Sequence, residues 1–522
     1  MAERNLLYGP SDLPDLNYDE DLGLPGEEPF TRGLHKNMYR GRPFTMRQLS
    51  GSGSPQYINE RIKWLLGSGA TGINLILDMA TVQMFDSDEP ESDGEVGTTG
   101  VPIDCIEDMD TIFKDIPIDK VSTSIVTHYP RNTAILFPMY LVLAEQRGIP
   151  WGKLTGSVQN DFIMENVVRN GPEYIPPRDA FRIQCDNIEF ITKHVPRWNH
   201  ITLNGYNLRE AGTSSVTEMA VAMANGIETL KELVRRGHDV DSIAPRMAFF
   251  WSVGNDFFEE IARLRAARRL WCRLIKRLFN AKNPKSLWAR CHVQTSGISL
   301  QHQEPMNNIV RAGYQALAGI LGGAQSLHVD SYDEAYSTPS EEASLLSLRT
   351  QQIIEVETGI IQVVDPLGGS YYIESLTNEM EGRILAEIEE IDKMGGIVKA
   401  VESGWLHRKI TSYGYREQKM IDDGELKIVG RNHYKVSGVN EPDIEVHEYS
   451  EELRQAMCDK LESFRRDRDN AKLDFALGDL SLACDKGDNV MPSTIEAVRA
   501  GATEGEMRRV FSDAFGGWLP PQ

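Results

Sequence analysis

The sequence predicts an α/β protein, a TIM-type (β/α)8 barrel with an extended N-terminal arm and a C-terminal helical segment. Eight β-like runs recur between about residue 70 and residue 365, each roughly 30 to 50 residues from the next. Helical stretches with apolar residues at three- and four-residue steps separate them. Such alternation indicates a parallel sheet, and eight is the number of strands that closes a barrel. Closure is inferred from this count alone.

The chain divides into three parts. Residues 1–30 are rich in proline, glycine and acidic residues and predict an arm lying on the body or on a partner subunit. Residues 31–370 carry the predicted barrel, with strands expected at 73–77, 122–126, 154–158, 201–203, 246–250, 289–293, 326–329 and 360–364. Residues 371–522 predict a linking or capping segment, with an amphipathic stretch at 379–404 and a charged helical pair at 451–484.

The stretch at 256–279, DFFEEIARLRAARRLWCRLIKRLF, shows the helical pattern clearly, because its apolar residues fall at three- and four-residue steps. Its arginines suggest either an anion or RNA surface, or a solvated helix face. In an acidic chain the solvated face is the better interpretation.

Composition narrows the class of protein. The 522 residues carry a formal net charge of −22, which argues against a general nucleic-acid binder but leaves room for a basic pocket and an anionic substrate. The six cysteines form no C-x-x-C pair and fit reduced, mostly buried thiols of a cytoplasmic protein. No basic-then-apolar leader and no run of roughly 18 apolar residues occurs, so a soluble, unexported protein is expected.

Polar residues follow the predicted strands, where the active site of a closed barrel forms. The stretch ITLNGYNLREAG (201–212) places a tyrosine and an amide at such a strand end. Glutamine, asparagine, tyrosine and serine dominate the set, and these residues orient substrates, whereas a hydrolase more often shows a nucleophile beside a base. The set comprises Ser124, His128, Gln159, Asn160, Asp161, Tyr206, Asn207, Gln294, Thr295, Ser296, Asp330, Asp333 and Glu334.

Several competing signatures are missing from the sequence: G-x-G-x-x-G, the Walker P-loop, H-E-x-x-H and G-x-S-x-G. GSGSP (51–55) is interpreted as a plain turn, and the histidines lack metal-ligand spacing, so no metal is predicted. In NMYRGRPFTMRQLSGSG (37–53), Arg42 and Arg47 with Thr45 between them could grip a phosphate. The alternative for this stretch is a surface turn with ordinary arginines.

Seven stretches together resemble the substrate-binding chain of adenosylcobalamin-dependent acyl-CoA mutases, the methylmalonyl-CoA mutase family. The similarity runs from about residue 30 to 435 and more loosely through the tail. The stretches are RPFTMRQLSG, DMATVQMFDSD, GSVQNDFIMENVVRN, WNHITLNGYNLREAG, APRMAFFWSVGNDFFEEIARLRAARRLW, NPKSLWARCHVQTSG and QSLHVDSYDEA.

The resemblance implies a (β/α)8 barrel with the CoA chain along its axis and a cobalamin domain over the carboxyl ends of the strands. It also implies radical rearrangement of an acyl-CoA thioester, with the radical supplied by the cofactor. The positions that match CoA-binding residues are Met38, Arg42, Thr45, Arg47, Ser157, Asn199 and Arg246. The positions of the reaction cavity are Gln159, Tyr206 and Gln294. Glu334 matches the acid that holds the adenosyl ribose, Gln325 and His328 fall in the stretch facing the cobalamin, and Arg169 matches the arginine that pairs with a substrate carboxylate.

The sequence departs from the family pattern at several places. The cobalamin-ligand motif D-x-H-x-x-G is missing from this sequence, which implies a large subunit that needs a separate cobalamin-binding small subunit, with a heterotetramer as one assembly to expect. Leu49 stands where methylmalonyl-CoA mutase has a tyrosine, so the pocket should admit a bulkier acyl group. Asn207 replaces a histidine that hydrogen-bonds the thioester carbonyl, and Asp330 replaces an asparagine near the adenosyl group.

These features favour a mutase for a carboxylate-bearing acyl-CoA, such as a substituted succinyl- or malonyl-CoA. The alternatives are methylmalonyl-CoA itself and a monocarboxylic ester such as isobutyryl- or 2-hydroxyisobutyryl-CoA. A CoA-binding subunit without activity and a cofactor-free barrel lyase stay open as different classes of protein.

Overall fold

The computed structural model describes residues 4–168, 171, 174–436 and 449–521. Its strands lie in two parallel sheets, with the orders β1-β9-β8-β7-β6 and β2-β3-β4-β5. The α/β prediction with parallel strands is therefore confirmed. The strands are β1 (Thr45–Met46), β2 (Ile73–Leu75), β3 (Thr123–Ile125), β4 (Gly156–Val158), β5 (Trp198–Asn199), β6 (Ile201–Asn204), β7 (Met247–Val253), β8 (Cys291–Thr295) and β9 (Ser326–His328).

The two sheets meet at both pairs of edges. At one, Leu49 and Asn74 form a parallel bridge, and Ser50 N donates to Asn74 O across 3.0 Å. At the other, Thr202 N donates to Gln159 O across 2.9 Å, just beyond the short β5. Most strand residues are buried, as in the run MAFFWSV of β7, where Ala248 alone is partly exposed, because helices cover parallel sheets on the outside.

The prediction of a strand at 360–364 is wrong. Ile360–Gln362 form a 3₁₀ helix after the left-handed Gly359, and these residues pair with no strand. The place beside β9 belongs instead to β1, where Thr45 pairs with Ser326 and Met46 with Leu327. Each of the other seven predicted runs overlaps a strand of the structure.

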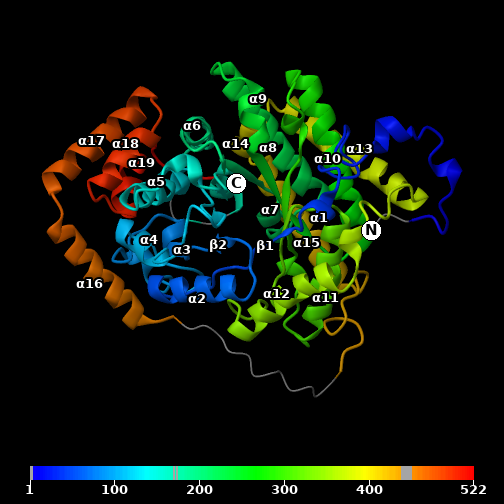
Figure 1. The fold of residues 1–522 in the computed structure, drawn as a ribbon, viewed down its shortest axis with the longest axis horizontal. Helices are drawn as coiled ribbons and strands as arrows, with labels where there is room; N and C mark the ends of the chain where they lie inside the picture. The colour runs from blue at the N-terminus through cyan, green and yellow to red at the C-terminus, as the bar shows by residue number, and fades with distance from the viewer. Residues whose placement is uncertain (1–3, 169–170, 172–173, 437–448, 522) are drawn as a thin grey trace.

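Helices follow the strands in alternation and pack against the sheets (Figure 1). Serine residues cap the N-termini of two of these helices, as their sequences favour. Ser54 Oγ accepts a hydrogen bond from Tyr57 N at the start of α2, where Pro55 is the first helical residue, and Ser214 Oγ accepts one from Thr217 N at the start of α8. The helices up to the end of the sheets are α1 (Met38–Gly41), α2 (Pro55–Gly67), α3 (Met79–Val82), α4 (Ile106–Ile112), α5 (Pro130–Gln146), α6 (Pro177–His194), α7 (Tyr206–Glu210), α8 (Ser215–Arg235), α9 (Val240–Ile243), α10 (Phe257–Phe279), α11 (Asn307–Leu321) and α12 (Glu341–Val356).

The helices that follow are α13 (Tyr371–Lys393), α14 (Ile397–Glu402), α15 (Trp405–Asp422), α16 (Glu451–Asp467), α17 (Asn470–Lys486), α18 (Met491–Arg499) and α19 (Glu504–Phe515). This agrees with the expected helical character of the stretches at 379–404 and 451–484. No helix in the described ranges is both long and apolar enough to cross a membrane.

The interpretation of the arginines on α10 as a solvated face is wrong, since four of them are buried. Each guanidinium meets acceptors supplied by segments distant in sequence. Arg263 pairs with Glu218 and Glu260, Arg265 with Asp365 and Glu374, and Arg269 with Glu381, while Arg268 donates to the carbonyls of Phe30, Thr31 and Gly322. The arginine face of α10 thus holds the N-terminal segment and α13 against the body.

The N-terminal segment (dark blue in Figure 1) lies beside α10 and α13. Arg4 pairs with Asp256 across 2.6 Å, and the ring of Tyr8 lies 4.8 Å from that of Tyr372. Leu22 and Phe30 are buried, which anchors the segment in the core.

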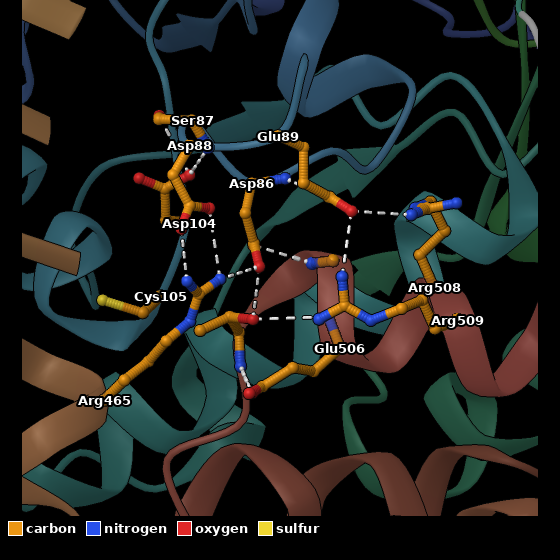
Figure 2. Close-up of polar contacts among 12 residues, drawn as sticks. Asp86, Ser87, Asp88, Glu89, Asp104, Cys105, Arg465, Glu506, Arg508 and Arg509 are labelled. Atoms are coloured by element: carbon orange, nitrogen blue, oxygen red, sulfur yellow. Dashed lines mark hydrogen bonds and ion pairs between the residues drawn. The ribbon is translucent and has the colours of Figure 1, made fainter. Parts of the chain in front are cut away.

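The C-terminal helices α16 to α19 lie on the opposite side, next to α4 and α5 (Figure 1). Figure 2 shows the polar contacts that join them to the loop after α3. Arg465 of α16 reaches Asp86 and Asp88, and Asp86 also accepts from Gly505 N across 2.8 Å and from Thr503 Oγ1 across 2.7 Å. The last helices are therefore held to the loop after α3 through the buried carboxylate of Asp86.

Candidate active site

A cavity of about 390 Å³ lies between the two sheets. Its wall draws side chains from strands of both sheets and from the loops at their ends. Twelve of the residues singled out from the sequence line it: Thr45, Arg47, Leu49, Ser124, His128, Ser157, Gln159, Asn199, Tyr206, Asn207, Gln294 and Gln325.

The cavity follows the strands because alternate residues of each strand face it. On β8, His292 and Gln294 line the wall together with Arg290 just before the strand, and on β7 the lining residues are Ala248 and Phe250. The carboxyl ends of parallel strands meet at one end of the cavity and the amino ends at the other. The position of a lining residue along its strand therefore tells at which end of the cavity it lies.

Tyr206 and Gln294 form the centre of the carboxyl end. The Tyr206 ring stacks on Phe250, with centroids 4.8 Å apart and planes at 9°. Gln294 Nε2 donates to the phenol oxygen across 2.8 Å and to Asp330 Oδ1 across 2.7 Å. Stacking and hydrogen bonding together leave the tyrosine one orientation.

An amide network lies beside this pair. Asn204 Nδ2 donates to Asn207 Oδ1 across 2.9 Å and to Gln159 Oε1 across 3.2 Å, and Asn207 N donates back to Asn204 Oδ1. The side-chain oxygens of Asn207 and Gln159 accept these hydrogen bonds. Their side-chain NH₂ groups have no acceptor among the described residues. Both amines can donate to a carbonyl oxygen in the cavity.

Acidic groups surround the carboxyl end. Burial raises the pKa of Asp330 to about 8, and burial with the nearby Asp330 raises the pKa of Glu210 to about 8. Burial and Asp330 also raise the pKa of Glu334 well above its ordinary value. Because burial disfavours the charged form of a carboxyl group, all three groups are shifted toward the protonated form, which can donate a hydrogen bond.

His328 completes this acidic group. Its Nδ1 lies 3.1 Å from the carbonyl oxygen of Arg47 and must carry the proton, and burial lowers the pKa of the ring, so Nε2 is unprotonated. In the described part of the chain, His328, Asp330 and Glu334 alone bring ligand atoms within 4.8 Å of one another as an ion site would need. These three side chains therefore form one compact polar cluster at the carboxyl end of the cavity.

Two buried atoms of this cluster, His328 Nε2 and Asp330 Oδ2, have no hydrogen-bond partner. Buried polar atoms without partners cost free energy, so a ligand that supplies hydroxyl groups would satisfy both. The residues present therefore fit the ribose of a nucleoside-bearing cofactor such as adenosylcobalamin.

At the amino end, Arg47 is no surface-turn residue. Its guanidinium donates to Ile73 O across 3.0 Å and to Ser122 Oγ across 2.7 Å, and burial, with Arg42 second, lowers its pKa to about 10. No carboxylate neutralises it in the described ranges. Thr45 lies beside it in the cavity wall.

The expectation that Gln325 faces the cofactor does not fit the structure. Gln325 stands just before β9, and its Oε1 accepts from Cys291 N at the start of β8 across 2.8 Å. It therefore lies at the amino end of the cavity, away from Glu334. The misplacement arose because Gln325 and His328 sit at opposite ends of one short strand.

Other expected residues lie outside the cavity wall. Met38 lines a small separate cavity near Arg268, and Arg42 and Arg246 lie beyond the wall, Arg246 directly before β7. Arg169 lies outside the described residues.

Several lining residues do not stand out in the sequence, among them Ile76, Thr202, Arg290, His292 and Ser326. A residue two positions from a recognised one shares its face, so Gln294 points to 292 and 290. That period-two signal was available in the sequence for these positions on β8.

The cavity is suited to binding and orienting rather than to nucleophilic attack. His292 Nδ1 lies 2.8 Å from Ser326 Oγ, but burial and the cation Arg47 hold its pKa well below the ordinary value, so it is a poor base. Burial raises the pKa of the Cys291 thiol to about 11. Neither side chain is an activated nucleophile.

Comparisons with known proteins agree with this chemistry. The model of the family described as methylmalonyl-CoA mutase matches residues 2–517. The chain is 42% identical over 511 residues to the 2-hydroxyisobutanoyl-CoA mutase large subunit of Aquincola tertiaricarbonis, which covers 98% of this chain and 90% of that protein. It is 41% identical over 513 residues to the methylmalonyl-CoA mutase of Cereibacter sphaeroides, with 98% and 71% covered. It is 39% identical over 515 residues to the mitochondrial methylmalonyl-CoA mutase of Homo sapiens, with 98% and 67% covered.

The match spans nearly the whole chain, and the relatives are named as mutases, which are isomerases. The chain belongs to the methylmalonyl-CoA mutase family of adenosylcobalamin-dependent acyl-CoA isomerases.

Proposed function

We propose that this chain is the substrate-binding large subunit of an adenosylcobalamin-dependent mutase that rearranges the carbon skeleton of a carboxylate-bearing acyl-CoA. The observation that carries the proposal is the cavity, which has uncompensated arginines toward its amino end and a tyrosine held among amides at its carboxyl end. A CoA thioester has the matching polarity, with phosphates at one end and an acyl group at the other.

The two sheets form one closed eight-stranded barrel in this proposal. The Leu49–Asn74 bridge at one edge and the Thr202–Gln159 hydrogen bond at the other support it. With β5 and β6 counted as one interrupted strand, the order runs β1 to β9 and returns to β1. The barrel occupies residues 31–370, the arm residues 1–30, and the linking or capping segment residues 371–522.

The chain's residues have distinct tasks. Thr45, Arg47, Ser157, Asn199 and Arg246 bind along the CoA chain, and the amines of Asn207 and Gln159 donate to the thioester carbonyl. Tyr206, fixed by Phe250 and Gln294, packs against the migrating group and helps exclude water. Catalysis by this chain is thus positioning, desolvation and orientation.

Adenosylcobalamin, when bound, supplies the radical chemistry. Glu334, Asp330 and His328 would hold its ribose through the unsatisfied atoms described above. The corrin itself requires a separate small subunit in this proposal. Two findings support a separate small subunit. The Aquincola relative is named a large subunit, and its match to this chain covers 90% of that protein. The six free cysteines fit a reducing, cytoplasmic setting for this assembly.

The acyl group is proposed from three positions. Arg169 matches the arginine that pairs with a substrate carboxylate in the family. Leu49 lines the cavity and is smaller than the tyrosine of methylmalonyl-CoA mutase, so it leaves more space for the acyl group. Asn207 can donate a hydrogen bond through its side-chain NH₂ group but cannot act as an acid. Together they favour a substituted succinyl- or malonyl-CoA over methylmalonyl-CoA.

A 2-hydroxyisobutyryl or isobutyryl ester is the second candidate, because the Aquincola relative bears the name of such a mutase and is similar over nearly its full length. The replacement Arg169→Gln separates the two. It should weaken kcat/KM for a carboxylate-bearing ester by more than about tenfold, since a buried carboxylate loses a charged partner, and should leave a monocarboxylic ester unaffected. Equal kinetics on the true substrate would remove the carboxylate from the proposal.

A further inference from the structure

His328 is buried and keeps one ring nitrogen available for a ligand. The side chain is 1% exposed, and its Nδ1 lies 3.1 Å from the carbonyl oxygen of Arg47, which fixes the proton on Nδ1. Nε2 therefore carries a lone pair, and it is buried without a hydrogen-bond partner. A histidine that donates one N–H to a backbone carbonyl and keeps its other nitrogen unprotonated has the form of a metal ligand.

Two carboxyl groups lie beside this nitrogen. His328 Nε2 is 3.3 Å from Asp330 Oδ1 and 3.9 Å from Glu334 Oε1. Two atoms that each bind one zinc ion at about 2.1 Å stand about 3 to 3.5 Å apart, so these separations are close to those of ligands around a shared ion. Asp330 Oδ2 is a further buried oxygen without a partner. One imidazole nitrogen and two carboxylates form a ligand set that zinc and cobalt accept.

The end of β9 brings the three side chains together. His328 is the last residue of the strand, and Glu334 lies in the turn that follows, where its Oε1 accepts from Ser331 N across 2.6 Å. Gln294 Nε2 holds Asp330 from the neighbouring strand. The sequence predicts no metal because its histidines lack ligand spacing to one another, whereas this arrangement, H-x-D-x-x-x-E, needs only one histidine.

His200 is the contrast within the same molecule. It is fully buried, and its Nδ1 likewise has no hydrogen-bond partner. Burial lowers its pKa most, and the charged groups that contribute are the cations Arg290 and Arg246. A positive ion is repelled from a ring nitrogen beside cations, whereas the free nitrogen of His328 lies beside two acids.

We propose that the cofactor-free chain binds one divalent transition-metal ion, of the zinc or cobalt class, between His328, Asp330 and Glu334, with water at the remaining positions. The carboxyl groups bind the ion in their charged form, so the ion displaces the protons that they otherwise hold. The ion uses the same atoms, His328 Nε2 and Asp330 Oδ2, that are assigned above to the ribose of the cofactor. Ion and ribose therefore exclude each other; this exclusion rests on the proposed function, whereas the ion site itself does not.

The test is titration of the full chain, first stripped of metal with a chelator, with Zn²⁺ by calorimetry and with Co²⁺ by visible absorption at pH 8. The variants are His328→Gln, Asp330→Asn and Glu334→Gln, each of which removes one ligand. Asp330→Asn also restores the asparagine of the family pattern. The controls are His194→Gln and Asp474→Asn, at exposed positions on α6 and α17.

Thermal unfolding without metal checks that each variant is folded. Glu334→Gln, at the least buried of the three positions, serves if His328→Gln does not fold.

The wild-type chain should bind one Zn²⁺ per chain. Each of the three variants should bind it about tenfold or more weakly, because a ligand is lost, and the two controls should bind it as the wild type does. Zn²⁺ should raise the Tm of the wild type but not that of Asp330→Asn, since only an ion that binds the folded chain stabilises it. At saturating Co²⁺ the visible absorption should change in His328→Gln, where the nitrogen ligand is missing.

Two results overturn the inference. A wild-type chain that binds neither Zn²⁺ nor Co²⁺ would show that the three groups hold no ion. Binding of equal strength in the wild type and the three variants would place the ion elsewhere on the chain. Neither result touches the proposed function, whose failure shows separately in the turnover of acyl-CoA esters.

Discussion

The amide of Gln294 holds the phenol of Tyr206, with 2.8 Å between Gln294 Nε2 and the tyrosine oxygen. The two residues come from different units of the fold, β8 and α7. The same amide nitrogen also reaches Asp330 after β9. One glutamine thus links the segments that follow β6 and β9 to the end of β8, and the orientation of the tyrosine depends on that link.

Tyr206→Phe tests the role of the phenol. The ring should still stack on Phe250, so CoA-ester affinity should stay within about twofold, while turnover falls about tenfold or more because a positioned hydrogen-bonding group is lost. Steady-state kinetics of the reconstituted enzyme measure both. Tyr415→Phe, at an exposed position, is the control. A loss of affinity without a loss of turnover would assign the phenol to ground-state binding only.

Asp330→Asn tests the protonated state of Asp330. The folded-state pKa is about 8, against about 3.9 in an unfolded chain, so between these values the folded protein keeps a proton that the unfolded chain has released. The free energy of unfolding therefore falls as pH rises from about 4 to about 8. Asparagine does not titrate, so the variant does not lose stability in this way. The Tm of the variant minus that of the wild type should therefore increase as the pH rises from about 4 to about 8.

Thermal unfolding at pH 5, 7 and 9 measures the effect, and Asp474→Asn, at an exposed position on α17, is the control. A Tm difference that is the same at all three pH values would show that Asp330 is not protonated in the folded protein.

Leu49→Tyr tests the acyl pocket. Leu49 lines the cavity, and a tyrosine there fills space that the acyl group would use. We expect kcat/KM for a bulky alkylsuccinyl ester to fall about tenfold or more and that for methylmalonyl-CoA to fall less, since overpacking penalises the larger ligand. Leu49→Ile keeps the volume and should change little. Equal losses for both esters would place Leu49 away from the acyl group.

Arg465→Met tests the contact of the C-terminal helices shown in Figure 2. Burial already raises the pKa of Asp86 to about 6, and loss of its cation leaves a buried carboxylate with neutral donors only. Because Arg465 is partly exposed, we expect a loss of about 1–2 kcal/mol in the free energy of unfolding. Faster hydrogen exchange should appear in α16 and α19.

Arg466→Met is the matched control, because the next side chain along is exposed and pairs only with Asp467. Its effect should stay within about 0.5 kcal/mol. Equal effects of the two replacements would show that Arg465 contributes no more than a surface charge.

The alternation of strands and helices could be predicted from sequence because period-two and helical patterns are local. The strand β1 could not, since two residues within RPFTMRQL carry no such pattern, and an apolar run at 360–364 took its place. The buried arginines of α10 were misjudged for a similar reason. Their carboxylate partners Asp365, Glu374 and Glu381 lie about a hundred residues away, where no local pattern connects them.

The candidate site was predictable at strand ends and less so within strands. Tyr206, Asn207, Gln159 and Gln294 stand beside turns, where polar residues attract attention. Arg290 stands in a stretch that looks like any strand start, and only the lack of a compensating charge in three dimensions sets it apart.

The most direct test of the central claim is reconstitution. The chain is mixed with a cobalamin-binding small subunit of this family and adenosylcobalamin. The methylmalonyl, alkylsuccinyl, isobutyryl and 2-hydroxyisobutyryl esters of CoA are then followed by mass-resolved chromatography. The account predicts cofactor-dependent isomerisation of a dicarboxylic ester, fastest for the bulky one, and its loss in Tyr206→Phe. Conversion of monocarboxylic esters alone, or no conversion of any ester by a chain that binds CoA, would contradict it.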